Sequence, residues 1–335
     1  MMFNPIRTLF LILLFSIASF ASDTRPTLTI YTYDAFAVSW GPGPKIKEAF
    51  EKEYDCNVKF VGLSSSIGAL RKIQLEGKNT KADILLGLDT NIAQAANKTG
   101  LFAKHDLNTS NLDLPVPYTD EYFVPYDYSY VAFVYNENKV KNPPTSFEAL
   151  AAMPEDFKIV IQDPRSSTPG LSLLLWVKEI YKEKAGEYWK RLSPHILTIT
   201  KGWSESYGLF LKGEADMVLS YTTSPAYHII EENRTNFKSA RFNEGHYGQI
   251  EVAAMLNSSK HKDLAKKFLQ FMHSETFAEI IPTANWAYPV VKTKEGLPKV
   301  FETLTQPSKM ILLDGKTVEA HRKEIINEWL RALER

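Results

Sequence analysis

Short apolar runs alternate with helical patterns along most of the chain, and this alternation constrains the fold more than any other feature. Three apolar runs, at 28–31, 58–61 and 84–86, are each followed by a segment whose apolar residues recur at helical spacing. A strand, a helix and a further strand in this order form the βαβ unit, which builds a parallel sheet covered by helices. The sequence therefore predicts an α/β protein.

A second series of the same kind follows the first. Its expected strands and helices lie at 130–134, 159–161, 171–181, 203–211 and 217–219. In a chain of 335 residues, two such series predict two α/β lobes. An expected strand at 250–254, an amphipathic segment at 264–271 and a charged helix at 318–333 come last. We therefore expect the second lobe to return the chain to the first.

The N-terminus has the pattern of a secretory signal peptide, predicted to span residues 1–21. Arg7 precedes the apolar run 9–17, and Ser19-Phe20-Ala21 has the small-x-small form of a cleavage site. The run is about half of the ~20 residues that a membrane span needs. We therefore expect the mature protein to be soluble in the periplasm.

The charge balance and the cysteine content argue against several classes of function. Removal of residues 1–21 takes one basic residue from 39 basic and 39 acidic residues, which leaves a formal charge of −1. This balance predicts no binding to nucleic acid or to an anionic membrane. The single cysteine, Cys56, cannot form an internal disulfide, and the seven histidines form no HExxH motif. No metal site is predicted.

Hydroxyl side chains gather at two turns where an expected strand leads into a helix. Ser167 and Thr168 stand just before one proline, and Thr222, Thr223 and Ser224 stand just before another. In open parallel sheets, ligands lie beyond the carboxyl ends of the strands, and helix starts favour anions. Ser167, Thr168, Thr223 and Ser224 are candidates for holding one phosphoryl group between them. The alternative is plain helix capping.

Ser65 and Ser66 lie at a third strand-to-helix turn, in the expected first lobe. Their hydroxyl groups are candidates for closing the site from the opposite side, and the alternative is again helix capping. Arg165 has two interpretations as well, a phosphate contact or a salt bridge to Asp163.

Aromatic residues also stand at the ends of expected strands. Tyr33, Trp203, Tyr221 and Tyr227 lie next to the polar turns rather than along an apolar stripe. Such ring faces can stack on a flat heteroaromatic cation, at ~0.5–2 kcal/mol per contact. Trp176, by contrast, lies inside a helical apolar pattern and is expected in the core.

Ordered blocks of sequence are shared with a known family. They lie at 31–34, 40–44, 77–79, 98–104, 162–165, 167–170, 201–205 and 219–228. With these blocks the chain resembles the periplasmic thiamine-binding proteins of bacterial ABC importers, over almost the whole mature chain.

This resemblance implies a type II periplasmic-binding-protein fold. Each of its two lobes is a mainly parallel sheet flanked by helices, and the ligand cleft lies between the lobes. We expect lobe 1 to comprise 22–127 and 249–287, and lobe 2 to comprise 128–248 and 288–335. The implied protein is a monomer without catalytic activity or cofactor. It binds thiamine, thiamine monophosphate or thiamine diphosphate and delivers it to an inner-membrane permease driven by a cytoplasmic ATPase.

The ligand residues that the resemblance implies are Tyr33, Ser65, Ser66, Ser167, Thr168, Trp203, Tyr221, Thr222, Thr223, Ser224 and Tyr227. Ser65-Ser66 stands where the family has an Asp-Gly pair, so a carboxylate of the first-lobe contact is missing.

Two other functions are alternatives on the same scaffold. A thiaminase-like transferase would need Cys56 as its nucleophile, but no base lies near it in the sequence. A ferric-iron-binding protein would use tyrosine phenolates, usually adjacent tyrosines with acids or histidine, whereas Tyr221 and Tyr227 are separated.

Overall fold

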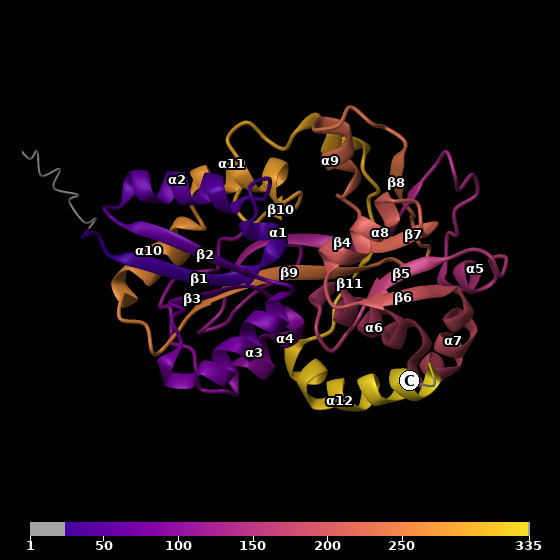
Figure 1. Cartoon of the computed structure of the whole chain (residues 1–335), viewed down its shortest axis with the longest axis horizontal. Helices are drawn as coiled ribbons and strands as arrows, with labels where there is room; N and C mark the ends of the chain where they lie inside the picture. Colours follow the sequence, from indigo (N-terminus) through magenta and orange to yellow (C-terminus); the bar gives the residue numbers. More distant parts are fainter. Residues whose placement is uncertain (1–23, 334–335) are drawn as a thin grey trace, which may run out of the picture.

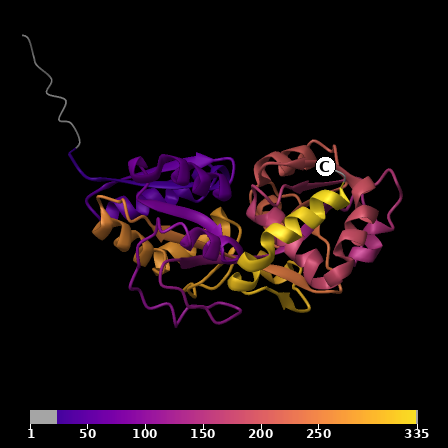
Figure 2. The same ribbon diagram turned by 90° about the horizontal axis from the view of Figure 1, so that it is seen from below.

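The computed structural model describes residues 24–333. The predicted signal peptide, residues 1–21, lies outside the described residues. Within them, no helix is both long and apolar enough to cross a membrane. Two bodies lie side by side and are joined in the middle (Figure 2).

The first half opens with the predicted alternation of strands and helices. Its elements are β1 (Thr27–Tyr33), α1 (Asp34–Ala37), α2 (Gly43–Glu53), β2 (Asn57–Leu63), α3 (Ser66–Glu76), η1 (Gly77–Asn79), β3 (Ile84–Asp89) and α4 (Thr90–Asn97). Strand β1 pairs in parallel with both β2 and β3. The three predicted strands of this half are therefore confirmed, together with their parallel arrangement.

The second half repeats the design. Its elements are α5 (Phe147–Ala151), β5 (Ile159–Gln162), α6 (Thr168–Tyr181), η2 (Lys182–Lys184), α7 (Ala185–Leu192), η3 (Ser193–His195), β6 (Ile196–Thr200), α8 (Trp203–Leu211), β7 (Met217–Tyr221), α9 (Pro225–Ile230) and β8 (Phe237–Ser239). Strand β5 lies between β6 and β7 and is parallel to both. Figure 1 shows this sheet beside that of the first half.

Two long strands connect the halves, β4 (Val124–Asn136) and β9 (His246–Met255). Strand β4 pairs with β9 at 124–130 and with β7 at 131–135, both times antiparallel. Strand β9 also pairs with β3, so the full order is β2-β1-β3-β9-β4-β7-β5-β6. Because both strands take part in both halves, the predicted lobe boundaries near 127 and 248 stay a prediction.

The last part of the chain packs on both halves. It forms α10 (Lys262–Phe271), α11 (Glu275–Ala284), β10 (Tyr288–Pro289), η4 (Lys299–Thr303), β11 (Met310–Ile311) and α12 (Gly315–Ala332). Helices α10 and α11 lie on the first half, next to α2 (Figure 1). Helix α12 contacts α4 of the first half and α6 and α7 of the second.

Short polar side chains begin many of these helices. The side chains of Ser65, Asp89, Ser146, Ser274 and Asp314 each accept a hydrogen bond from a backbone N–H of the first turn. Such caps satisfy donors that the helix itself leaves free. They fix where a strand stops and its helix starts, which positions the turns that carry the site.

The apolar core lies under the helices. Trp176 is completely buried beside Phe147 and Phe242, which confirms the prediction that it is a core residue. Cys56 is completely buried in the core of the first half, among residues of α2, α10 and β2. Burial raises the pKa of its thiol.

Candidate functional site

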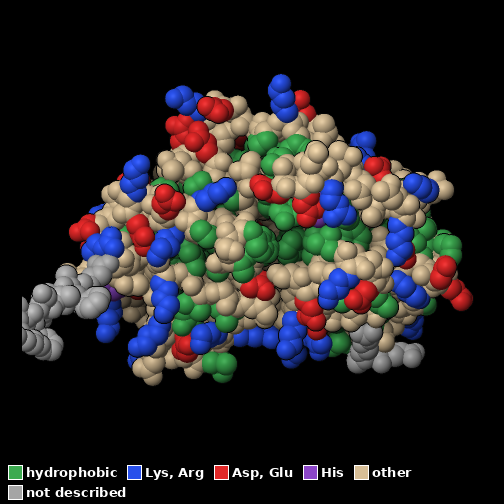
Figure 3. All heavy atoms as spheres, turned by 45° about the horizontal axis from the view of Figure 1, so that its top comes forward, with side chains coloured by type: hydrophobic (Ala, Val, Ile, Leu, Met, Phe, Trp, Pro, Cys, Tyr) green, Lys and Arg blue, Asp and Glu red, His purple; other side chains and the backbone are tan. Residues whose placement is uncertain are grey.

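A cavity of about 280 Å³ lies between the two halves. Hydrophobic side chains gather in the hollow at the middle of the molecule (Figure 3). Seven aromatic side chains line the cavity: Tyr33, Trp40, Trp203, Tyr207, Tyr221, Tyr227 and Trp286. The enclosed space is thus walled mainly by ring faces, as in sites for flat organic molecules.

The indole of Trp203 is held by two contacts. It is the first residue of α8, its Nε1 donates to Ser220 Oγ over 2.8 Å, and its ring stacks on Tyr207 with 4.7 Å between centroids. Tyr207 in turn bonds through its hydroxyl to His228 Nε2. Because its neighbours are ordered in this way, Trp203 presents a fixed ring face to the cavity.

The other rings have partners as well. The hydroxyl of Tyr221, at the end of β7, accepts a hydrogen bond from Gln249 Nε2 over 3.1 Å. Tyr227 meets Trp286 edge to face at 5.4 Å. Trp40 stands at the rim, with 53% of its surface exposed.

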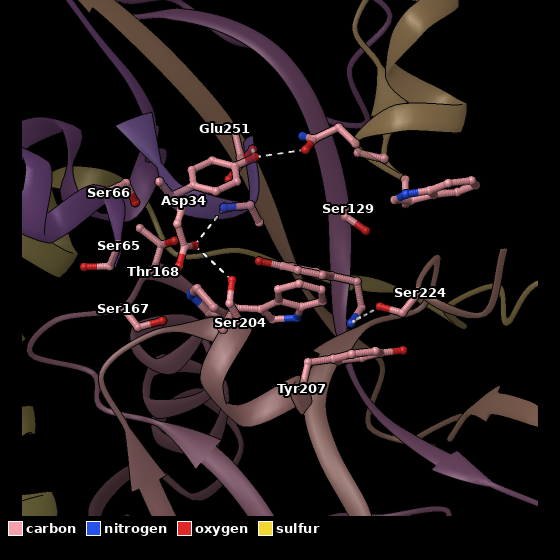
Figure 4. Close-up of a pocket in the computed structure, with 18 of the residues that line it drawn as sticks. Asp34, Ser65, Ser66, Ser129, Ser167, Thr168, Ser204, Tyr207, Ser224 and Glu251 are labelled. Atoms are coloured by element: carbon pink, nitrogen blue, oxygen red, sulfur yellow. Dashed lines mark hydrogen bonds between the residues drawn. The ribbon is translucent and has the colours of Figure 1, made fainter. Parts of the chain in front are cut away.

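Hydroxyl groups form one end of the cavity, where the starts of α3 and α6 meet (Figure 4). Ser65 caps α3, its Oγ accepting from Gly68 N over 3.0 Å. Ser66, Ser167 and Thr168 are buried, and no side-chain hydrogen bond joins any of them to another described residue. Three hydroxyl groups at two helix N-termini are thus available to a ligand.

Gly170 allows α6 to begin at this place. A Cβ atom there would lie 2.5 Å from the backbone oxygen of Gln162 on β5. Only a glycine lets the first turn of the helix approach the strand so closely.

Acidic side chains line the cavity from the connecting strands. Glu251 on β9 accepts hydrogen bonds from Tyr126 at 2.7 Å and from Tyr33 at 3.0 Å, and Asp127 on β4 accepts one from Asn285 at 2.6 Å. Burial raises the pKa of Glu251 to about 7. Burial and the neighbouring Glu251 carboxylate raise the pKa of Asp127 well above its ordinary value.

Asp34 is a third acid of the cavity, and it joins the two halves. Its Oδ1 accepts hydrogen bonds from Ala35 N and, across the cleft, from Ser204 Oγ at 2.9 Å (Figure 4). Of the described residues that line the cavity, none is lysine, arginine or histidine. The charge of the walls is therefore negative, which suits a positively charged ligand.

Nine of the eleven predicted ligand residues line this cavity: Tyr33, Ser65, Ser66, Ser167, Thr168, Trp203, Tyr221, Ser224 and Tyr227. Thr222 and Thr223 do not, and both are completely buried. Thr223 Oγ1 bonds to Ser129 Oγ at 3.0 Å, behind the wall. Ser224 precedes Pro225 as predicted, but its Oγ bonds to Ser220 and Tyr221 rather than capping α9.

Sequence reasoning missed several residues of the cavity wall, among them Asp34, Asp127, Ser129, Tyr207, Gln249, Glu251, Asn285 and Trp286. A signal was present for Glu251, because it is an acid within the apolar run 250–254. Tyr207 follows Trp203 by one helical turn, so it too could have been inferred.

The structure shows the surroundings of Arg165 and Cys56, for which the sequence left two interpretations open. The guanidinium of Arg165 bonds to Asp163, as the salt-bridge interpretation predicts, and Arg165 does not line the cavity. Cys56 lies in the core of the first half and is absent from the cavity wall. A nucleophile there could not reach a bound molecule.

Comparison with known proteins agrees with this architecture. The family model described as bacterial extracellular solute-binding protein matches residues 43–278. The chain is 51% identical to the thiamine-binding periplasmic protein of Escherichia coli (strain K12), covering 93% of this chain and 94% of that protein. It is 48% identical to the protein of the same name from Brucella suis, covering 94% of each chain.

Solved structures share the fold. A periplasmic thiamin binding protein superposes with a TM-score of 0.90 at 51% identity, covering 93% of this chain and 97% of that one. The periplasmic binding protein AfuA from Actinobacillus pleuropneumoniae superposes with a TM-score of 0.77 at 20% identity, covering 92% and 99%. The predicted periplasmic-binding-protein fold is therefore confirmed. The chain belongs to the family of bacterial extracellular solute-binding proteins, whose members bind solutes and are not enzymes.

Proposed function

We propose that the protein captures thiamine in the periplasm as the solute-binding component of an ABC importer. The observation that carries this proposal is a cavity walled by seven aromatic side chains, in which the only described charged residues are acids. Thiamine is a flat molecule with a permanently cationic thiazolium ring. Ring faces and carboxylates attract such a cation, and exclusion of water strengthens both interactions. The relatives at 51% and 48% identity, which are named for thiamine binding, support the same ligand.

The two ends of the cavity suit the two ends of a phosphorylated ligand. In our proposal the rings of thiamine lie among Trp203, Tyr221 and Tyr227. A phosphate of thiamine monophosphate or diphosphate then reaches the hydroxyl groups of Ser167 and Thr168. Free hydroxyl groups and the N-terminal dipoles of α3 and α6 favour an anion there without any basic side chain. Ser65 and Ser66 complete this end from the first half.

Delivery to a membrane permease with a cytoplasmic ATPase is part of the proposal. So is a monomeric state in the periplasm, after removal of residues 1–21. Both rest on the family and on the relatives, which are periplasmic proteins.

Titration calorimetry with thiamine, thiamine monophosphate and thiamine diphosphate tests the proposal. We expect micromolar to nanomolar dissociation constants, about −8 to −12 kcal/mol, which a few stacked rings and charge-assisted hydrogen bonds can supply. Mass spectrometry of the copurifying ligand should identify thiamine or a phosphate of it. Absence of thiamine binding would contradict the proposal, and an absorption band on addition of ferric citrate would favour the iron-binding alternative.

A double variant, Ser167→Ala with Thr168→Val, separates the two ends of the cavity. It removes two hydroxyl groups while α6 keeps its length, so the phosphorylated ligands should lose roughly tenfold or more in affinity. Free thiamine should bind as before. An equal loss for all three ligands would place the phosphate elsewhere.

A further inference from the structure

Asp127 and Glu251 form a pair of carboxyl groups at the inner wall of the cavity. They stand opposite each other on the antiparallel strands β4 and β9. The register shifts between Pro125 and Asp127, so β4 carries a bulge at this place. A bulge re-aims side chains that would otherwise alternate. Consequently Tyr126 and Asp127, neighbours in the chain, both reach Glu251.

The hydrogen-bond donors around the pair are neutral. Tyr33 from β1 and Tyr126 from β4 donate to Glu251, and Asn285 after α11 donates to Asp127. The other titratable groups that act on the pair are Asp89 at the end of β3 and Tyr221 at the end of β7. None of these groups is a cation. Two buried carboxylates this close repel each other and are destabilised without a counter-charge.

Sharing a proton removes this repulsion. The two carboxyl groups line the cavity from opposite positions of the strand pair, and the Glu251 carboxylate, together with burial, raises the pKa of Asp127 well above its ordinary value. Such a pair titrates as a unit, and burial raises the pKa of both members, that of Glu251 to about 7 and that of Asp127 well above its ordinary value. The pair thus holds a proton at the cavity wall, where a cation would fit.

We propose that Asp127 and Glu251 together are the counter-anion for the ligand's cationic ring, and that the proton they share passes to solvent when the cation binds. One carboxyl O–H bond breaks, the buffer accepts the proton, and the ligand's positive charge replaces it. This inference rests on the proposed function, because it assigns a specificity-determining role within the thiamine site.

Proton release can be counted directly on the wild-type protein. Thiamine is titrated calorimetrically in buffers of different ionisation enthalpy, at pH 6, 7.5 and 9. We expect protons to be released on thiamine binding at pH 6, and fewer protons as the pH rises through the pKa of the pair. The dissociation constant should rise as the pH falls below about 7, because protons then compete more strongly with the cation for the pair. Tight binding without proton release at any pH would overturn the inference and leave the proposed function standing. Absence of thiamine binding at every pH would overturn the proposed function itself.

A neutral ligand tests whether the positive charge of thiamine causes the proton release. The 3-deaza analogue of thiamine has carbon in place of the cationic nitrogen and nearly the same shape. It should bind more weakly than thiamine at pH 9 and release no proton at pH 6. Equal proton release by the two ligands would mean that the pair meets another part of the molecule, which would overturn the assignment.

The amide variant, Asp127→Asn with Glu251→Gln, removes both charges and nearly preserves shape. It should bind thiamine at least tenfold more weakly than the wild type at pH 8, with neither pH dependence nor proton release. Glu279→Gln, an exposed acid on α11, is the matched control and should keep all three properties. If the double variant keeps the wild-type proton count, other groups titrate and the inference is wrong. If the double variant does not fold, the calorimetric titrations of the wild-type protein in different buffers test the inference without it.

Discussion

At the scale of the residue, the site consists of side chains whose neighbours hold them in place. Trp203 is bonded to Ser220 and stacked on Tyr207, and Tyr221 is bonded to Gln249. A ring that is already ordered loses little conformational entropy when a ligand stacks on it. The orienting contacts therefore matter for affinity even where they do not touch the ligand.

Substitution of Trp203 tests the stacking role. Trp203→Ala removes the ring face, and we expect the dissociation constant for thiamine to rise about 10- to 100-fold. Trp203→Phe keeps a face and loses only the bond to Ser220, so its effect should be less than about tenfold. Calorimetry of both variants gives the comparison, and an unchanged affinity in Trp203→Ala would rule out stacking.

Some of these residues could be predicted from the sequence and others could not. Tyr33, Trp203 and Tyr221 could be found because they stand at strand ends, where ligand sites of open sheets lie. Asp127 could not, because its position depends on a bulge in β4 that no local pattern predicts. Thr222 looked equivalent to Ser224 in the sequence, yet β7 and the turn after it direct Thr222 inward.

At the scale of the element, the turn between β6 and α8 brings the second half against the first. A Cβ atom on Gly202 would lie 2.1 Å from the backbone oxygen of Ser64, in the turn before α3. The extended backbone of Gly202, with φ −148°, is open to any residue. Glycine is thus required here for the distance between the two turns and not for the local conformation.

Gly202→Ala should therefore act on the contact between the halves. The added methyl group cannot be accommodated unless the two turns separate, so thiamine affinity should fall at least about tenfold. The radius of gyration with saturating thiamine, measured by small-angle scattering, should exceed that of the wild type. Gly186→Ala on α7 is the control, because its Cβ would make only ordinary contacts with Glu328. A normal radius and affinity in Gly202→Ala would mean that this approach is not needed for binding.

At the scale of the whole molecule, polar contacts join the two halves at the cleft and behind it, where Asn91 Nδ2 donates to Ser172 Oγ over 3.3 Å. Ser204 Oγ donates to Asp34 Oδ1 over 2.9 Å, and Arg71 Nη2 donates to the backbone oxygen of Arg165 over 2.8 Å. Hydrogen bonds at the mouth of the cleft are easily exchanged for water, which lets a ligand that touches both halves shift the balance between separated and joined arrangements.

A double-mutant cycle on Asp34→Ala and Ser204→Ala measures the first contact. We expect a coupling of about 1 kcal/mol in thiamine binding, since one charge-assisted hydrogen bond is lost. The free energy of unfolding should show less coupling, because the bond forms only when the halves meet. A coupling that is equal in binding and in unfolding would mean that the halves stay joined without ligand.

The strand and helix alternation predicts the overall architecture well. The predicted strand at 159–161 and the predicted helix at 203–211 lie almost where the structure has them. The run 130–134, however, predicts only part of β4, because polar residues such as Asp127 and Ser129 interrupt its pattern. These residues line the cavity. The polar side chains at the site therefore interrupt the apolar pattern by which the strand could have been predicted.

Strands β4 and β9 prevent either half of the protein from being encoded by one uninterrupted segment of the gene. The chain passes from one half to the other within each of these strands, so no single break in the gene releases a half that could be inherited or exchanged alone. Recombination between related genes at one such point would join segments of two different proteins. The strands brought together in this way would not have been selected to pair. Substitutions on the two walls of the cavity are therefore linked through strands that belong to both halves.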